Sequence, residues 1–166
     1  TDLLIEGVHF PAGTDPADIG HKALAVNLSD LAAMGATPAW FTLGITLPQV
    51  DEPWLADFCR GLYGLAAQHQ VQLIGGDTTR GPVRLLAITA LGFAPRGTAL
   101  TRGGARPGDQ IFVTGQLGDA ALGLAIVEQR LKADAVTAQA LRGRTRGPRR
   151  TRRTAATTAT AHTARP

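Results

Sequence analysis

Residues 73–82 read L-I-G-G-D-T-T-R-G-P. An apolar run that includes Val71, Leu73 and Ile74 predicts a buried strand, and the two glycines that follow predict its end. A simple turn needs glycine or aspartate, but not an aspartate, two hydroxyls and an arginine together. The segment therefore predicts a functional site where a strand ends, with a plain turn at Asp77 as the alternative.

The residues before this segment alternate between strand and helix patterns. Residues 1–10 and 41–47 favour extended chain and end at prolines, so each predicts a strand. Asp15-Pro16-Ala17-Asp18 is typical of a helix start, and Gly35 is typical of a helix stop. The helix between them is apolar nearly all round, which predicts that it is buried. A second helix is expected from Asp51, with an apolar stripe that belongs to the core, formed by Leu55, Phe58, Leu62 and Leu65.

The residues after the segment continue the alternation. A long strand is expected over about 83–93, followed by a turn at 106–109, a strand over 110–114 and a helix over about 119–131. Alternating strands and helices predict an α/β (α+β) fold in which helices pack on a mixed sheet.

The net charge of +4 hides two regions of opposite charge. Residues 1–140 contain 9 Lys and Arg against 13 Asp and Glu, whereas residues 141–166 contain 8 Arg and no acid. The acidic body gives no electrostatic reason to expect nucleic-acid binding. The tail lacks the apolar residues that could offset its ordering entropy, so we expect it to be disordered.

The cellular location has only weak signals in the sequence. The 166 residues show no apolar run of membrane-spanning length and no charged-then-apolar leader, which predicts a soluble protein. The one cysteine, Cys59, cannot form an internal disulfide, and this suits a reducing cytoplasm. We expect Cys59 to be inert, because it lies near the apolar stripe with no base close to it in sequence.

Four aspartates occupy positions where a carboxylate needs an explanation. Asp2 lies in an apolar strand, Asp30 late in the buried helix, Asp77 after the double glycine and Asp119 at a helix start. A buried carboxylate is costly unless hydrogen bonds or a cation stabilise it. Each also has an ordinary explanation, in which Asp2 is solvated near the chain end, Asp30 satisfies the helix end together with Asn27, and Asp119 caps its helix.

Together these residues favour a site for a hard cation and phosphate. Several carboxylates without cysteine ligands or paired histidines match oxygen-preferring cations such as Mg²⁺. The adjacent glycines give phosphate room, and Arg80 and Arg102 offer forked donors. Neither G-x-x-x-x-G-K-[ST] nor the kinase glycine loop occurs, so spacing alone indicates phosphoryl chemistry without a specific enzyme.

Five ordered blocks of the chain resemble thiamine-monophosphate kinases. They run from Thr1 to about Arg142 and read T-D-L-L-I-E-G-V-H-F, H-K-A-L-A-V-N-L-S-D-L-A-A-M-G-A-T-P-A-W, L-I-G-G-D-T-T-R-G-P, A-L-T-R-G-G-A-R-P-G-D and V-T-G-Q-L-G-D-A-A-L-G-L-A. The resemblance implies a two-domain synthetase-like α/β fold and a homodimer formed through the N-terminal sheet. It also implies Mg²⁺-dependent phosphorylation of thiamine monophosphate by ATP.

The resemblance further implies roles for individual residues. Thr1, Asp2, Asp30 and Asp77 would bind Mg²⁺, Gly76 with Asp77 and Arg102 would contact ATP, and His9 would contact the substrate. No role is implied for Asp119. The ordinary explanation for His9 is a packed or surface histidine on a strand.

The chain departs from the family pattern at both ends. A Gly-Asp-Asp segment is expected before Thr1 and an Asp-x-Ser-Asp-Gly motif after residue 142, and the sequence contains neither there. We therefore expect an N-terminal domain over 1–104 that lacks its first strand, the start of a truncated second domain over 105–140, and the tail over 141–166. An out-of-frame reading of GC-rich DNA would explain the Arg, Thr and Ala of the tail. A genuine basic tail that binds nucleic acid or acidic partners is the alternative.

Three functions are compatible with these observations. The first is part of a thiamine-monophosphate kinase that is inactive alone, and the second is a non-catalytic dimerisation or nucleotide-binding module. The third is a sister ATP-dependent enzyme such as selenophosphate or aminoimidazole ribonucleotide synthetase, which the second block also resembles. The run G-G-D-T-T-R-G at residues 75–81 argues against the third.

Overall fold

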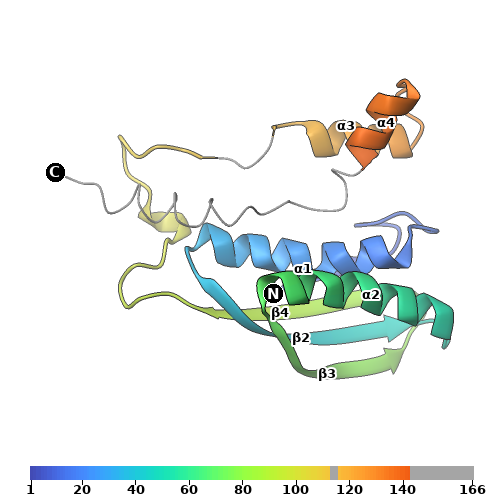
Figure 1. The fold of residues 1–166 in the computed structure, drawn as a ribbon, viewed down its shortest axis with the longest axis horizontal. Helices are drawn as coiled ribbons and strands as arrows, with labels where there is room; N and C mark the ends of the chain where they lie inside the picture. The colour runs from blue at the N-terminus through green and yellow to red at the C-terminus, as the bar shows by residue number, and fades with distance from the viewer. Residues whose placement is uncertain (113–115, 143–166) are drawn as a thin grey trace.

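The computed structural model describes residues 1–112 and 116–142, and strands and helices alternate in it as the sequence predicts (Figure 1). In chain order the elements are β1 (Asp2–Ile5), α1 (Pro16–Ala33), β2 (Thr37–Leu47), α2 (Glu52–His69), β3 (Gln72–Arg80), β4 (Leu85–Phe93), the 3₁₀ helix η1 (Arg102–Gly104), α3 (Asp119–Val127) and α4 (Ala135–Arg142). The predicted α/β class is confirmed. The tail predicted to be disordered over 141–166 begins inside α4, which includes Leu141 and Arg142, so the prediction is wrong for these two residues, and residues 143–166 lie outside the described residues.

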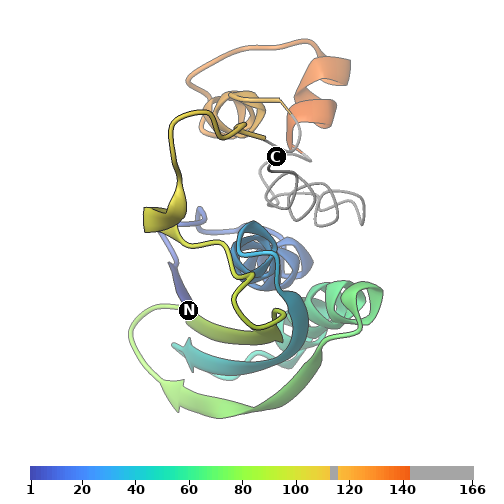
Figure 2. The ribbon, with the colours of Figure 1, turned by 90° about the vertical axis from the view of Figure 1, so that its left-hand side faces the viewer.

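The four strands form one mixed sheet in the order β1-β4-β2-β3. β4 pairs antiparallel with both β1 and β2, whereas β2 and β3 run parallel. Parallel neighbours need a crossover connection, and α2 supplies it. α1 and α2 lie side by side on one face of the sheet, with α3 and α4 beyond α1 (Figure 2).

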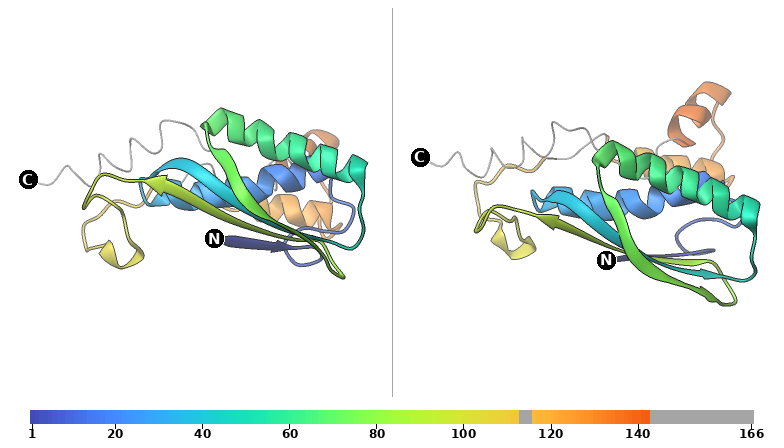
Figure 3. Two further views of the ribbon diagram at one scale, coloured as in Figure 1. Left: turned by 90° about the horizontal axis from the view of Figure 1, so that it is seen from below. Right: turned by 60° about the horizontal axis from the view of Figure 1, so that its bottom comes forward.

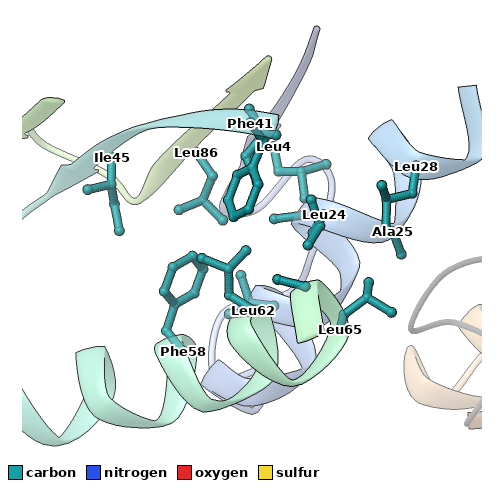
Figure 4. Packing of buried hydrophobic residues seen from close by; sticks show 14 of the residues in the cluster. Leu4, Leu24, Ala25, Leu28, Phe41, Ile45, Phe58, Leu62, Leu65 and Leu86 are labelled. Atoms are coloured by element: carbon teal, nitrogen blue, oxygen red, sulfur yellow. The ribbon is translucent and has the colours of Figure 1, made fainter. Parts of the chain in front are cut away.

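The core fills the space between the sheet and these two helices (Figure 4). Leu24 of α1, Phe41 of β2 and Leu62 of α2 are 0% exposed. The stripe predicted in α2 is confirmed, because Leu62 is buried with Phe58 and Leu65 and Leu55 packs against them. Burial of each such side chain stabilises the folded chain by about 1.5–3 kcal/mol. The sheet and these two helices therefore share one hydrophobic core.

Two glycines let α1 and α2 pack closely. A Cβ added to Gly61 would overlap the backbone of Ala17, and one added to Gly20 would overlap the backbone of Phe58. At these two points the backbone of one helix therefore packs directly against a glycine of the other helix.

The predicted helix ends are confirmed. The Asp15 carboxylate accepts a hydrogen bond from the backbone N–H of Ala17 at 2.8 Å, and the Asp51 carboxylate accepts one from Trp54 at 3.0 Å. Gly35 has a φ of +73° just after α1, which is the conformation that glycine adopts at helix ends.

Several predicted boundaries are wrong. β1 ends at Ile5 rather than Pro11, because Gly7, with a φ of +80°, starts a turn that contains His9. β3 does not end at the double glycine but continues to Arg80, since the glycines pair with β2. The predicted helix over 119–131 ends at Val127. Residues 110–112 form no strand, and the rest of the strand predicted over 110–114 lies outside the described residues.

No helix of the described residues covers the other face of the sheet, which we call the open face (Figure 3). Leu3, Trp40, Leu91 and Phe93 alternate along their strands with core-facing residues and are exposed. The Trp40 and Phe93 rings pack edge to face, with 5.4 Å between their centroids. Within the described ranges, no helix has both the length and the hydropathy needed to cross a membrane.

Candidate functional site

The residues predicted to bind metal, nucleotide and substrate come from separate parts of the fold. They lie at the start of β1, in the turn after it, in the last turn of α1, in β3 and in η1, and they are Thr1, Asp2, His9, Asp30, Gly76, Asp77 and Arg102. The register of the sheet decides which of them share a side.

Asp2 lies on the helix-covered side of the sheet. It is opposite Ile88 of β4, and residues that are directly opposite in a sheet share a face. Ile88 is only 1% exposed beneath the helices. Because α1 packs over β1 and β4, Asp30 in the last turn of α1 belongs to the same side as Asp2.

Asp77 lies on the open face. It is opposite Gly44 of β2, a position that alternates with core-facing Ile45. The hydroxyl of Thr1 lies 2.8 Å from that of Thr89, and Thr89 alternates with buried neighbours in β4. Thr1 therefore shares the open face with Asp77.

A large distance also separates Asp2 from Asp77. β1 and β3 are the two edge strands, with β4 and β2 between them. Three strand spacings of about 4.8 Å put the two backbones roughly 14 Å apart. A single Mg²⁺ holds its oxygen ligands at about 2.0–2.1 Å. Within one chain, Asp2 and Asp77 therefore do not share a cation.

The acidic side chains also form no cluster of metal ligands within the described part of the chain. Among the described residues, no three histidine, cysteine or acidic side chains gather in a way that could hold a metal ion. The chemistry of the predicted donors nevertheless fits Mg²⁺, because they are carboxylates and a hydroxyl. The predicted ligands of one chain form two incomplete groups, Asp2 and Asp30 on the helix-covered side of the sheet, and Thr1 and Asp77 on the open face, where β4 and β2 separate their strands.

The expectation that these carboxylates are buried is wrong. Asp30 and Asp77 are exposed, and Asp2 is half-buried. The buried polar residue of α1 is Asn27, whose amide donates to the carbonyl of Ala23 at 2.9 Å. Solvent reaches the carboxylates, so their positions alone do not require a cation.

Gly76 is the position in the motif where a side chain would not fit. It has a φ of +153°, and an added Cβ would overlap the backbone of Leu43 in β2. Gly75 has open space at the same point. Residues 74–80 of this edge strand are all exposed, so a ligand can approach the main chain beside Asp77.

The start of η1 is tied to the end of α1. The Leu100 N–H donates to the carbonyl of Met34 at 3.0 Å, and the Met34 N–H donates to the carbonyl of Asp30 at 3.1 Å. Arg102 follows two residues later, so it lies near the same end of α1 as Asp30. Arg80, the other candidate phosphate donor, places its Nε 3.3 Å from the carbonyl of Pro48.

His9 lines a pocket of about 660 Å³ between the turn after β1, the first half of α1, and α3. The wall is largely apolar and includes Phe10, Ile19 and Leu124. Lys22 of α1 also lines it, and partial burial lowers the pKa of Lys22. Lys22 was not among the predicted site residues, although it is the only lysine or arginine in the apolar stretch 16–34.

Asp119 is the first residue of α3 rather than its cap. The N-cap is Gly118, with a φ of +96°. A carboxylate in the first turn of a helix is stabilised by the helix dipole, which gives Asp119 a local role.

Comparison with known proteins identifies relatives of the whole described region. Residues 1–94 match the family described as AIR synthase related protein, N-terminal domain. Thiamine-monophosphate kinase of Escherichia coli (strain K12) is 58% identical over 142 residues, which cover 85% of this chain and 43% of that relative. The chain therefore spans less than half the length of this curated relative.

Solved structures agree with the sequence comparison. The crystal structure of thiamine-monophosphate kinase from Stenotrophomonas maltophilia K279a matches with a TM-score of 0.86 and 46% identity, over 96% of this chain and 52% of that one. The structure of AaThiL complexed with AMPPCP and TMP matches with a TM-score of 0.80 and 30% identity, over 92% of this chain and 48% of that one.

Proposed function

The chain belongs to the AIR synthase related family, and from this premise we propose that it is part of an ATP-dependent thiamine-monophosphate kinase. Such an enzyme transfers the γ-phosphoryl group of ATP to thiamine monophosphate and forms thiamine diphosphate. The observation that carries the proposal is the 58% identity to a thiamine-monophosphate kinase over 142 residues. A relative of the same fold holds AMPPCP, an ATP analogue, together with TMP.

The proposed reaction gives a function to the predicted metal ligands. Thr1, Asp2, Asp30 and Asp77 would bind Mg²⁺, which neutralises charge between two phosphorylated molecules and aligns them. The acceptor is a phosphate that is already anionic, so no strong general base is needed. Gly76 and Asp77 on the exposed edge strand, and Arg102 beside the end of α1, would contact ATP.

The two incomplete ligand groups favour a site that two copies of the chain complete. Leu3, Ala87, Gly44 and Asp77 form one row across the open face, from the edge strand β1 to the edge strand β3. A two-fold axis between two open faces, parallel to the strands, would place β3 of one copy over β1 of the other. Asp77 would then approach Thr1 of the second copy, which lies on the open face at the start of the chain.

The exposed apolar side chains support the same homodimer. Leu3, Trp40, Leu91 and Phe93 are each at least 39% exposed on the open face. An exposed apolar surface of this kind marks an interaction site on a soluble domain. Small residues in the middle row, Gly44 and Ala87, would let the two sheets approach closely.

The acceptor is assigned to the pocket that His9 lines. Its apolar wall suits an organic ring system, and we assign to His9 the contact with the phosphate of thiamine monophosphate. Residues 1–104 would form the N-terminal domain and residues 105–140 the start of a second domain that completes the enzyme.

A coupled assay of ADP release tests the proposed function. With ATP, Mg²⁺ and thiamine monophosphate, a full-length relative should turn over, and this 166-residue chain should show negligible turnover. The chain should still bind a Mg²⁺–ATP analogue. Robust turnover by this chain alone would show that the 43% of the relative's length that it spans is enough for catalysis. Absence of nucleotide binding would contradict the assignment of the site.

A further inference from the structure

The turn between β1 and α1 is held closed by its own backbone. The N–H groups of Val8 and His9 both donate to the carbonyl of Ile5, at 3.1 and 2.9 Å, and the Gly7 N–H donates to the carbonyl of Phe10 at 2.9 Å. Phe10 is 4% exposed and anchors the end of the turn in the core. His9 is therefore presented by a constrained turn.

A further hydrogen bond fixes the proton on the His9 ring. The backbone N–H of Ile5 lies 3.0 Å from Nδ1 of His9. A backbone amide can only donate, so Nδ1 is the acceptor and carries no proton. In a neutral imidazole the single proton is then on Nε2. His9 is therefore a hydrogen-bond donor through Nε2 at the pocket that it lines.

The backbone of His9 is held from a second element. Nζ of Lys22, on α1, donates to the carbonyl of His9 at 2.8 Å. A charged donor makes one of the stronger hydrogen bonds. The ring of His9 is thus anchored by β1 and its carbonyl by α1.

We propose that Lys22 is a positioning residue that keeps the turn closed, so that His9 presents a single donor, Nε2–H, to an anionic phosphate oxygen of the acceptor. Lys22 acts through His9 in this assignment. The identity of the acceptor rests on the proposed function, whereas the fixed tautomer and its dependence on Lys22 do not.

The tautomer is tested on this chain by long-range ¹H–¹⁵N NMR of the histidine rings at neutral pH. A His9→Gln variant identifies the His9 signals among those of the four histidines. The native chain should show a bare Nδ1 and a protonated Nε2. Lys22→Met should give a mixture of tautomers, and Lys22→Arg, which keeps a donor, should restore the native spectrum. Lys22→Gln replaces Lys22→Met if circular dichroism shows that the latter does not fold.

Two NMR results would overturn the proposal. One is a native His9 with its proton on Nδ1, and the other is a folded Lys22→Met chain with an unchanged spectrum. Lys132→Met, at the other lysine of the chain and exposed, is the matched control and should leave the His9 signals in place.

Kinetics in a full-length relative provide the second readout. Substituting methionine for the lysine that matches Lys22 should raise KM for thiamine monophosphate about tenfold, the size expected for loss of one good hydrogen bond, and leave KM for ATP unchanged. Arginine should restore most of the loss. Equal effects on both KM values would contradict the positioning role. If Lys22→Met alters the His9 tautomers of this chain but the full-length relative does not phosphorylate thiamine monophosphate, the proposed function alone is contradicted.

Discussion

Asp2 and Asp77 lie on opposite faces of one sheet and on its two opposite edge strands. The register places Asp2 beside core-facing Ile88, and Asp77 beside Gly44 on the open face. Side chains so arranged cannot enclose one cation within a single chain. In the homodimer proposed above, Asp77 of one copy would instead meet Thr1 of the other, because both lie on the open face.

The homodimer proposed for the open face predicts the effect of a charge placed there. Leu91 is 43% exposed, so Leu91→Asp should fold as a single chain and weaken self-association at least about tenfold, because a carboxylate would be buried between the sheets. Sedimentation equilibrium of both chains measures this. Val50→Asp is the control, since Val50 is 80% exposed outside the strands. A native chain that stays monomeric at high micromolar concentration would refute the dimer.

Substitution by alanine should have a large effect at Gly76 and little effect at Gly75. Gly76→Ala should lower the free energy of unfolding by about 1–3 kcal/mol, because its Cβ would overlap the backbone of Leu43. It should also abolish binding of the Mg²⁺–ATP analogue. Gly75→Ala, with open space at its Cβ, should change the free energy of unfolding by less than about 0.5 kcal/mol. Chemical denaturation and calorimetric titration check both, and equal behaviour of the two variants would show that the strand register is different.

The close packing of α1 on α2 is tested by another matched pair. Gly61→Ala should destabilise the chain by about 1–3 kcal/mol, because the new methyl group meets the backbone of Ala17. Gly64→Ala, one turn later in the same helix and facing open space, should stabilise it by about 0.5–1 kcal/mol through helix propensity. Urea denaturation measures both. A stabilised Gly61→Ala chain would mean that the helices lie farther apart.

Burial of Lys22 predicts a pH dependence of stability. Burial lowers the pKa of Lys22 in the folded chain, so between that pKa and the ordinary value of 10.5 the unfolded chain binds more protons. The contribution of Lys22 to the free energy of unfolding therefore rises with pH across this window. The free energy of unfolding of the native chain minus that of Lys22→Met should therefore become more positive as pH increases towards 10.5. If this difference stays constant or becomes more negative as pH increases, the burial of Lys22 is contradicted. Lys132→Met is the control for the loss of a charge.

Local rules in the sequence predicted α1 and α2 well, whereas α3 ends earlier than expected and α4 was not predicted. Asp15 and Asp51 cap α1 and α2 as expected, because a carboxylate at that position accepts the unpaired N–H groups of the first turn. The stripe through Phe58 and Leu62 forms core because its spacing puts these side chains on one face. Such features depend on neighbours a few residues apart, which the sequence shows directly.

Features that depend on pairing between strands were predicted poorly. The double glycine suggested a strand end, yet Gly75 and Gly76 pair with β2 and the strand continues to Arg80. The faces of Asp2 and Asp77 follow from a register with an irregularity at Phe41 and Thr42, which no local pattern reveals. Lys22 was missed for the same reason, since its partner His9 lies in a turn that was expected to be a strand.

The most direct test of the central claim mixes two inactive chains. Thr1→Ala and Asp77→Asn should each weaken binding of a Mg²⁺–ATP analogue to this chain. In mixed dimers, one of the two sites would combine the native Thr1 of one copy with the native Asp77 of the other. Refolding the two variants together in equal amounts should therefore recover about a quarter of the native binding sites in calorimetric titration. Recovery of no sites, or native-like binding by either variant alone, would contradict a cation site shared between two copies.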